Sequence, residues 1–391
     1  MQEHDWPLPD PDAQAHSARL VDYIRQQIAA AGGSISFERY MDFALYAPGL
    51  GYYTAGSRKF GEAGDFVTAP EVSPLFARCL AGQCREVFAA LGGGDILEPG
   101  AGSGVLAADL LAELERMDAL PETYFILEVS ADLRARQRET LEKKVPQLQE
   151  RVTWLDAPPE NLRGVILANE VLDALPVARF RVHETGFSEQ AVTWNGGRFE
   201  TAWQPASPHF SNELDALFAT LPAPPAAPYV SERCRRLPAF VRALAGSLDA
   251  GLMLFIDYGY PRREYYLPER NAGTLMCHYR QRAHGDPFVY PGLQDITAYV
   301  DFTAVAEAGV EAGLDLHGFT SQAQFLLGSG LYDILPAVDP GDTVRSLKIS
   351  QEVQKLTMPG EMGDRFKAMG LSRGIERLIS GFSLKDISPA L

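Results

Sequence analysis

The chain has few cysteines, and they form no recognisable motif. Only four occur in 391 residues, and no two are spaced as C-x-x-C. They are Cys79, Cys84, Cys234 and Cys277. Four thiols are too few for a disulfide framework in a chain of this length. Metal-site spacing is also absent, since there is no H-E-x-x-H and the nearby His278 and His284 stand six residues apart. We therefore expect reduced thiols and no bound metal.

Long apolar runs and an excess of positive charge are missing as well. No stretch approaches the roughly 20 apolar residues of a membrane span, and Met1–Pro7 contains no basic region before an apolar one. The formal net charge is −16, which repels a nucleic-acid backbone. It favours a cationic partner, although it also serves solubility. We expect a cytoplasmic protein with no membrane insertion and no nucleic-acid partner.

Two catalytic motifs are absent around the most glycine-rich turn. No G-x-S-x-G elbow occurs, because Ser103 stands in G-x-G-S-G, and this disfavours a serine hydrolase. The nicotinamide dinucleotide fingerprint requires glycine at the sixth position from Gly100, where this chain has Val105. A nicotinamide-dependent dehydrogenase is therefore the weakest of the alternatives.

What is present is a strand, a glycine loop and a helix in direct succession. The apolar run Asp95–Pro99 predicts a short strand, and Val105–Leu111 has helical apolar spacing. Three alternating glycines, Gly100, Gly102 and Gly104, lie between them and let the backbone pass beneath a ligand. This succession is typical of a nucleotide-binding crossover unit in an α/β sheet.

The acidic residues around this loop resemble a known cofactor site. Glu98-x-Gly100-x-Gly102-x-Gly104 resembles motif I of the class I S-adenosylmethionine-dependent methyltransferases. That resemblance implies S-adenosyl-L-methionine as cofactor, S-adenosyl-L-homocysteine as product, and Glu98 near the methionyl amino group. The next predicted strand, Tyr124–Leu127, is followed by Glu128, a carboxylate placed to accept hydrogen bonds from two ribose hydroxyls.

A second resemblance is more specific. Gly64–Glu71, with the sequence GDFVTAPE, resembles a signature of the MidA-like methyltransferases, and Gly273–Phe302 is similar to the same family. The family includes a mitochondrial complex I assembly factor that methylates a protein arginine. The resemblance therefore implies protein arginine N-methylation linked to complex I assembly, with the quinone-proximal subunit as a candidate substrate. The predicted cofactor-binding residues are Glu98, Gly100, Ala101, Gly102, Gly104, Glu128, Val129, Asp156, Thr68 and Pro70. Asp156 suits a simple turn equally well.

The candidate catalytic residues follow another apolar strand. Gly164–Ala168 has no polar side chains, as expected of a strand covered on both faces, and it leads into Asn169, Glu170 and Asp173. Polar groups at the carboxyl end of a central strand face the ligand crevice. Two carboxylates one turn apart can hold the planar fork of a guanidinium, which stays protonated at physiological pH. Asp173 is equally suited to cap a following helix.

These patterns predict an α/β fold: a Rossmann-like, doubly wound methyltransferase sheet with a helical N-terminal extension and an antiparallel insertion. We divide the chain into five segments. They are 1–90 (helical extension and GDF loop), 91–177 (cofactor-binding half), 178–230 (antiparallel insertion and proline-rich connector), 231–335 (second half of the core) and 336–391 (peripheral segment). Within them we expect a helix over 231–248 and a peripheral cover that includes 361–369.

Alternatives remain for the function. A small-molecule methyltransferase fits the same cofactor motif, and so does a cofactor-binding assembly factor without catalytic activity. The predicted partner is a protein that presents an arginine, and a homodimer is possible.

Overall fold

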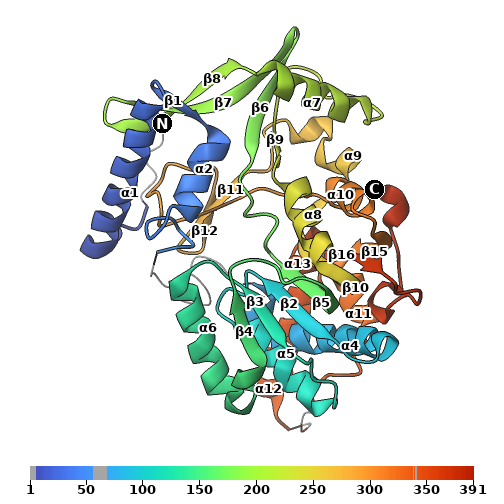
Figure 1. Cartoon of the computed structure of the whole chain (residues 1–391). Helices are drawn as coiled ribbons and strands as arrows, with labels where there is room; N and C mark the ends of the chain where they lie inside the picture. The colour runs from blue at the N-terminus through green and yellow to red at the C-terminus, as the bar shows by residue number, and fades with distance from the viewer. Residues whose placement is uncertain (1–5, 56–67, 338, 340) are drawn as a thin grey trace. The chain divides into compact units, whose positions relative to one another are not determined.

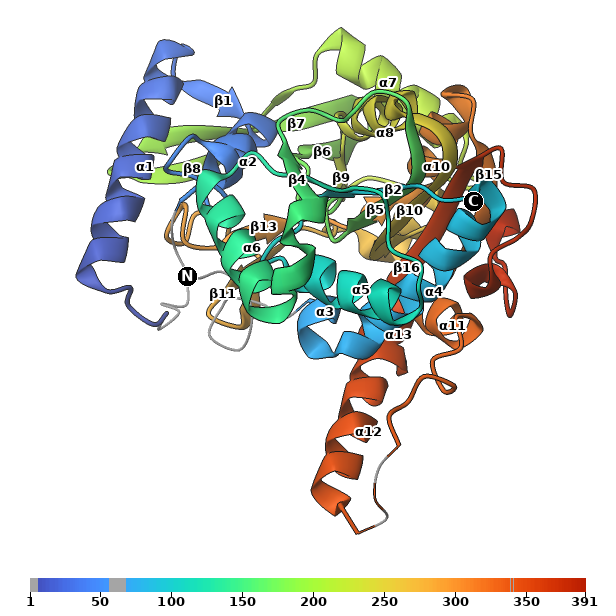
Figure 2. The same cartoon turned by 60° about the horizontal axis from the view of Figure 1, so that its bottom comes forward.

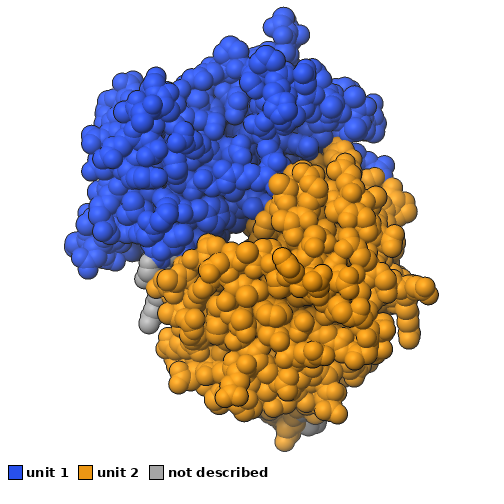
Figure 3. Space-filling view, in the orientation of Figure 1, with its two compact units in different colours: residues 1–66, 174–236, 263–299 blue, residues 67–173, 237–262, 300–391 orange. Residues whose placement is uncertain are grey.

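The computed structural model describes residues 6–55, 68–337, 339 and 341–391 (Figure 1). Residues Gly64–Val67 of the predicted family signature lie outside this described part. The chain forms two compact units, coloured separately in Figure 3. Unit 1 comprises 1–66, 174–236 and 263–299, and unit 2 comprises 67–173, 237–262 and 300–391. Each unit thus combines three separate stretches, whereas the five-segment division of the sequence stays a prediction.

Unit 2 is built on an eight-stranded sheet with the order β15-β16-β10-β5-β2-β3-β4 and β14 paired to β10. Its strands are β2 (Asp95–Pro99), β3 (Tyr124–Leu127), β4 (Val152–Leu155), β5 (Leu162–Asn169), β10 (Leu248–Tyr260), β14 (Val300–Asp301), β15 (Asp315–Ser321) and β16 (Phe366–Arg373). From β10 to β4 all neighbours are parallel. The chain order reverses between β5 and β2, which is where such sheets bind ligands. The predicted α/β doubly wound fold is confirmed.

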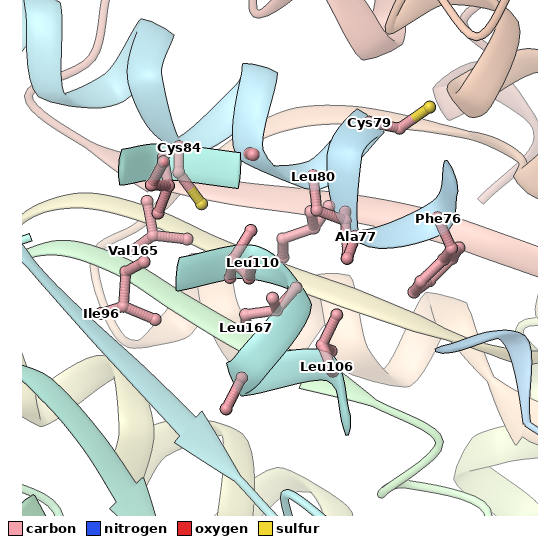
Figure 4. Close-up of a cluster of buried hydrophobic side chains, with 14 of the residues drawn as sticks. Phe76, Ala77, Cys79, Leu80, Cys84, Ile96, Leu106, Leu110, Val165 and Leu167 are labelled. Atoms are coloured by element: carbon pink, nitrogen blue, oxygen red, sulfur yellow. The ribbon is translucent and has the colours of Figure 1, made fainter. Parts of the chain in front are cut away.

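The helices of unit 2 precede and follow these strands along the chain. They are α3 (Ala69–Val72), α4 (Pro74–Leu91), α5 (Val105–Arg116), α6 (Ala131–Lys144), α8 (Leu237–Ser247), α10 (Phe302–Glu311), α11 (Gln322–Gly328), α12 (Thr343–Thr357) and α13 (Met362–Arg365), with 3₁₀ turns η1 (Pro146–Arg151), η3 (Ser380–Phe382) and η4 (Ser388–Ala390). Figure 4 shows α4 and α5 packed over the sheet, with Leu80 and Leu110 close to Val165 and Leu167. These side chains are almost completely buried. They form a close-packed layer that supports the strands whose ends border the predicted ligand crevice.

Two sequence expectations in this unit are corrected. The run 361–369 was predicted as peripheral, yet β16 lies inside the sheet and pairs antiparallel with both β10 and β15. Periodicity missed it because both faces are covered, so Phe366–Ser372 are all buried without alternation. The helix expected over 231–248 starts only at Leu237, since Tyr229–Arg233 forms strand β9 in unit 1.

Unit 1 contains a five-stranded sheet, β1-β7-β6-β9 with β8 on β7, and a three-stranded sheet, β12-β11-β13. Its elements are α1 (Pro11–Ala30), β1 (Ser34–Ser36), α2 (Phe37–Tyr46), β6 (Ala178–His183), β7 (Gly186–Asn195), β8 (Arg198–Pro205), α7 (Pro208–Ala219), β9, α9 (Arg262–Tyr265, of which Arg262 belongs to unit 2), η2 (Pro268–Arg270), β11 (Met276–Tyr279), β12 (Arg282–His284) and β13 (Asp295–Thr297). The predicted antiparallel insertion is present, and Gly196 and Gly197 form the β7–β8 turn at φ of 57° and 85°. Among the helices of the described residues, none combines the length and apolarity required to cross a bilayer.

Candidate functional site

The glycine loop joins β2 to α5 at the reversal point of the unit 2 sheet. Gly100, Gly102 and Gly104 all have left-handed backbones, with φ of 66°, 53° and 80°. A Cβ on Gly104 would lie 2.9 Å from the Cα of Gln137, and one on Gly100 would lie 3.2 Å from Val171 Cγ2. Only glycine combines this backbone conformation with so little space. Ala101 between them is buried.

Glu98 lies just before this loop with only 3% of its surface exposed. The hydroxyl of Tyr124, on the neighbouring strand β3, donates to Glu98 Oε2 at 2.7 Å. Burial raises the pKa of Glu98 to about 7, and the nearby Glu128 adds to the rise, while the Tyr124 hydrogen bond opposes it. A cation beside this carboxyl would therefore favour its ionised form.

Glu128 directly follows β3 and is also buried. Its Oε1 accepts the backbone N–H of Ser130 at 2.9 Å, and its Oε2 accepts the side-chain amide of Gln137 at 3.2 Å. Burial raises its pKa, although the hydrogen bonds from Ser130 and Gln137 oppose the rise. The adjacent Val129 is 71% exposed, so the acid is flanked by an open apolar side chain.

Gln137 of α6 also belongs to this site, although the sequence patterns did not single it out. Its side chain is completely buried. Besides Glu128, it donates to the carbonyl of Gly102 at 3.1 Å and accepts from Trp154 Nε1 at 2.9 Å. The glycine loop, the Glu128 acid and β4 are thus joined by one side chain. The available signal was its position in the buried stripe of α6, four residues from both Leu133 and Leu141.

Asp156 lies just after β4, and its side chain is 88% exposed. Arg134 donates to Asp156 Oδ1 at 2.5 Å and also to the carbonyls of Glu128 and Leu155. Asp156 therefore lies near Glu128, as the predicted cofactor-binding role requires. Its carboxylate is already paired with Arg134.

The short α3 turn brings the predicted Thr68 and Pro70 toward the glycine loop. Pro70 is buried and Thr68 is half-buried at the start of the turn. The hydrogen bond to the loop comes from their neighbour, because Glu71 Oε1 accepts the hydroxyl of Ser103 at 2.5 Å. Glu71 belongs to the predicted family signature, but no role was predicted for it.

The three predicted catalytic residues form an acidic turn after β5, defined here as residues 169–173. Glu170 has a left-handed backbone, with φ of 52°, and its N–H donates to the carbonyl of Ile256 on β10 at 2.8 Å. Its Oε1 accepts the side-chain amide of Asn169 at 3.2 Å and the N–H of Ala69 at 3.3 Å. A non-glycine residue in this conformation is uncommon and is typical of functional sites.

Asp257 on β10 supports the acidic turn and was not among the predicted catalytic residues. Its Oδ2 accepts the N–H groups of Leu172 at 2.9 Å and Asp173 at 3.2 Å, and its Oδ1 accepts that of Tyr258 at 2.8 Å. Burial raises its pKa well above the ordinary value, and Asp173 and Glu170 add to the rise. The signal available was its place at the end of the apolar run Leu252–Ile256, by the rule that singled out Glu98.

The residues around the loop fit an adenosine-containing sulfonium cofactor. Gly104 leaves no room for a Cβ, Glu98 has a pKa that a cation would lower, and Glu128 presents a carboxylate beside the exposed Val129. Across the described residues, no group of three His, Cys, Asp or Glu side chains is arranged to hold a metal. The fold and the loop together define a class I S-adenosylmethionine-dependent methyltransferase.

The chain belongs to the family described as "Putative S-adenosyl-L-methionine-dependent methyltransferase", which matches residues 79–320. It is 27% identical to the protein arginine methyltransferase NDUFAF7, mitochondrial, of Danio rerio, over 94% of this chain and 90% of that one. It is 25% identical to the Homo sapiens NDUFAF7, over 87% and 80%. The resemblance to MidA-like methyltransferases is thereby confirmed, and S-adenosyl-L-methionine is the cofactor on which the family depends.

Solved structures agree over the whole length. A Burkholderia thailandensis protein crystallised with S-adenosyl-homocysteine is 47% identical, with a TM-score of 0.93 over 99% of this chain and all of that one. A native crystal structure from the same organism is 46% identical, with a TM-score of 0.91. Similarity at this level covers both units and the C-terminal strand β16.

Proposed function

We propose that this protein transfers a methyl group from S-adenosyl-L-methionine to a guanidino nitrogen of an arginine in a protein substrate. The observation that carries the proposal is the acidic turn with Asp257: three carboxylates at the ends of adjacent strands β5 and β10, beside a methyltransferase glycine loop. The relatives named protein arginine methyltransferases support the choice of acceptor.

For the cofactor, we assign Glu98 to the methionyl amino group, Glu128 to the ribose hydroxyls and Val129 to the base. The glycine loop provides the backbone surface, with Ala101 packed beneath it, and Thr68, Pro70 and Asp156 stay candidates for further contacts. When bound, S-adenosyl-L-methionine supplies an electrophilic methyl group, and the departing sulfur becomes a neutral thioether that needs no general acid. The acceptor nitrogen releases one proton as it takes the methyl group, and a carboxylate of the acidic turn or water can accept it.

For the acceptor, the task of the chain is to orient a guanidinium and offset its charge. Glu170 and Asp173 can accept hydrogen bonds from the planar N–H fork, which directs one terminal nitrogen toward the methyl donor. Burial and mutual repulsion oppose full ionisation around Asp257. A bound guanidinium would remove that repulsion, and a neutral acceptor would not. Asn169, whose amide donates to Glu170, holds that carboxylate in place.

The wider setting is proposed from the same relationship. We infer a role in the assembly of respiratory complex I, with its quinone-proximal subunit as the candidate substrate, in an organism that has the complex. We further propose a cytoplasmic location, from the sequence alone, and a homodimer as a candidate assembly.

Calorimetry followed by mass spectrometry tests the proposal. The protein is titrated with S-adenosyl-L-methionine, then incubated with it and an extract from a strain that lacks the gene. We expect binding heat and a new methylated arginine in one protein of the extract. An extract treated with the Glu170→Gln variant provides the control, since it should show cofactor binding without the new modification.

The remaining outcomes separate the alternatives. Binding without any methylated product would favour an assembly factor without catalytic activity. Methylation confined to the small-molecule fraction would replace the protein acceptor by a metabolite. The absence of binding heat would contradict the transferase itself.

A further inference from the structure

The four-residue turn α3 makes hydrogen bonds in three directions within unit 2. Its own backbone is closed by the carbonyl of Thr68, which accepts the N–H groups of Glu71 at 2.9 Å and Val72 at 3.1 Å. It contacts α4, α5 and α12, and Figure 2 shows it close to α5. So short an element has little stability of its own, so its position depends on these outside contacts.

One contact reaches the glycine loop. Glu71 Oε1 accepts the hydroxyl of Ser103, which stands between Gly102 and Gly104, at 2.5 Å. The carbonyl of Ser103 accepts the hydroxyl of Thr140 on α6 at 2.7 Å. Ser103 is therefore held on one side by α6 and on the other by Glu71, and the loop conformation depends on both.

The other two contacts reach the acidic turn and the C-terminal helix. The N–H of Ala69, at the start of α3, donates to Glu170 Oε1 at 3.3 Å. At the end of α3, Ser73 donates its hydroxyl to Glu352 of α12 at 2.7 Å. The same turn thus touches the loop that binds cofactor and the carboxylate proposed to bind the acceptor, while α12 holds it from outside.

We propose that Glu71 is a positioning residue that fixes the glycine loop through Ser103 and, through α3, couples cofactor binding to the orientation of Glu170. The loop part depends only on membership of the methyltransferase family. The coupling part rests on the proposed function, because it takes Glu170 as an acceptor-binding residue.

A double-mutant cycle on S-adenosyl-L-homocysteine affinity tests the loop part. Glu71→Ala and Ser103→Ala should each weaken binding by about 10-fold, because either change removes the hydrogen bond between the two side chains. The double variant should be no weaker than Glu71→Ala alone. Glu71→Gln keeps an acceptor oxygen for the Ser103 hydroxyl and should retain most of the affinity.

Several results would overturn this. Additive losses in the double variant would mean that Glu71 acts independently of Ser103. A Glu71→Gln variant as weak as Glu71→Ala would assign the effect to charge. The exposed Glu150→Ala is the matched control and should bind as the unmodified protein does. If Glu71→Ala is unfolded in thermal melts, Ser103→Ala still tests the proposal. Unchanged cofactor affinity in Ser103→Ala would show that the Glu71–Ser103 hydrogen bond does not fix the loop.

The coupling part is measured with an arginine peptide. We expect S-adenosyl-L-homocysteine to tighten peptide binding to the unmodified protein by about 5-fold or more, and Glu71→Ala to reduce that factor toward one. A factor that Glu71→Ala leaves unchanged would refute the coupling. If no arginine peptide binds the unmodified protein, the proposed acceptor is wrong, whereas the cofactor cycle still decides the role of Glu71.

Discussion

The glycine loop after β2 and the acidic turn after β5 end two neighbouring strands of one sheet, and each requires a left-handed backbone. In the loop, that conformation is provided by residue type, since Gly100, Gly102 and Gly104 adopt it without a steric penalty. In the turn, Glu170 adopts it with a side chain and is held there by hydrogen bonds to β10. The cofactor half of the site is thus encoded locally, and the acceptor half depends on a strand about 90 residues further along the chain.

This contrast predicts the largest effect for a change within the loop. Gly104→Ala forces a Cβ to within 2.9 Å of the Gln137 backbone at a φ of 80°. We expect the affinity for S-adenosyl-L-homocysteine to fall by about 100-fold or more, since the loop or α6 must move. Gly92→Ala is the matched control, with a φ of 79° and nothing within 4 Å. Calorimetry that shows equal affinities for the two variants would contradict the steric argument.

A substitution in the acidic turn should lower turnover and leave cofactor affinity unchanged. Glu170→Gln keeps the shape of the side chain but removes the charge opposite the guanidinium. We expect kcat to fall by about 100-fold while S-adenosyl-L-homocysteine affinity stays unchanged. Methyl-transfer assays and calorimetry measure the two quantities separately. Product formation at the rate of the unmodified protein would contradict the assignment of Glu170 to the acceptor site.

The stability of the cofactor half of the site should depend on pH, because the pKa of Glu98 is raised in the folded state. With a pKa of about 7 against an ordinary value near 4.5, the protonated form is favoured by folding. The stability it contributes is complete below about pH 4.5 and is lost as the pH rises through 7. Glu98→Gln should therefore raise the free energy of unfolding at pH 8 by about 3 kcal/mol and weaken cofactor binding.

Thermal or urea unfolding without ligand, at pH 4.5 and pH 8, measures that difference. The stabilisation should be present only at the higher pH, and the exposed Glu122→Gln should show none at either. Equal stability of Glu98→Gln and the unmodified protein at pH 8 would contradict the raised pKa.

The smallest expected effect lies in the support of the acidic turn. Asp257→Asn leaves too few acceptor oxygens for the three N–H groups of Leu172, Asp173 and Tyr258. We expect kcat to fall by about 10-fold with unchanged cofactor affinity, because Glu170 loses part of its backbone support. Asp249→Asn, at an exposed position on the same strand, should be neutral. A loss of cofactor affinity instead would mean that β10 supports the glycine loop.

Sequence patterns predicted the position of a residue correctly where its neighbours in the chain determine its surroundings. Glu98 and Glu128 each follow an apolar run that can only be a buried strand, so their place at the sheet edge was predictable. Gln137 and β16 were missed for the opposite reason. Gln137 is a polar residue in the narrow buried stripe of a mainly polar helix, and β16 lacks the alternation of a half-buried strand, so only their tertiary neighbours show that both belong to the core.

The sequence by itself determined the class of sheet, the glycine loop and the two acids beside it, because these depend on local backbone preference and strand order. Only the tertiary structure decided how the acidic turn is held, by joining residues 169–173 to Asp257, and how Glu71 meets Ser103. The physical reason is that a hydrogen bond between distant residues depends on where the packed core brings them, and neither residue type nor spacing records that.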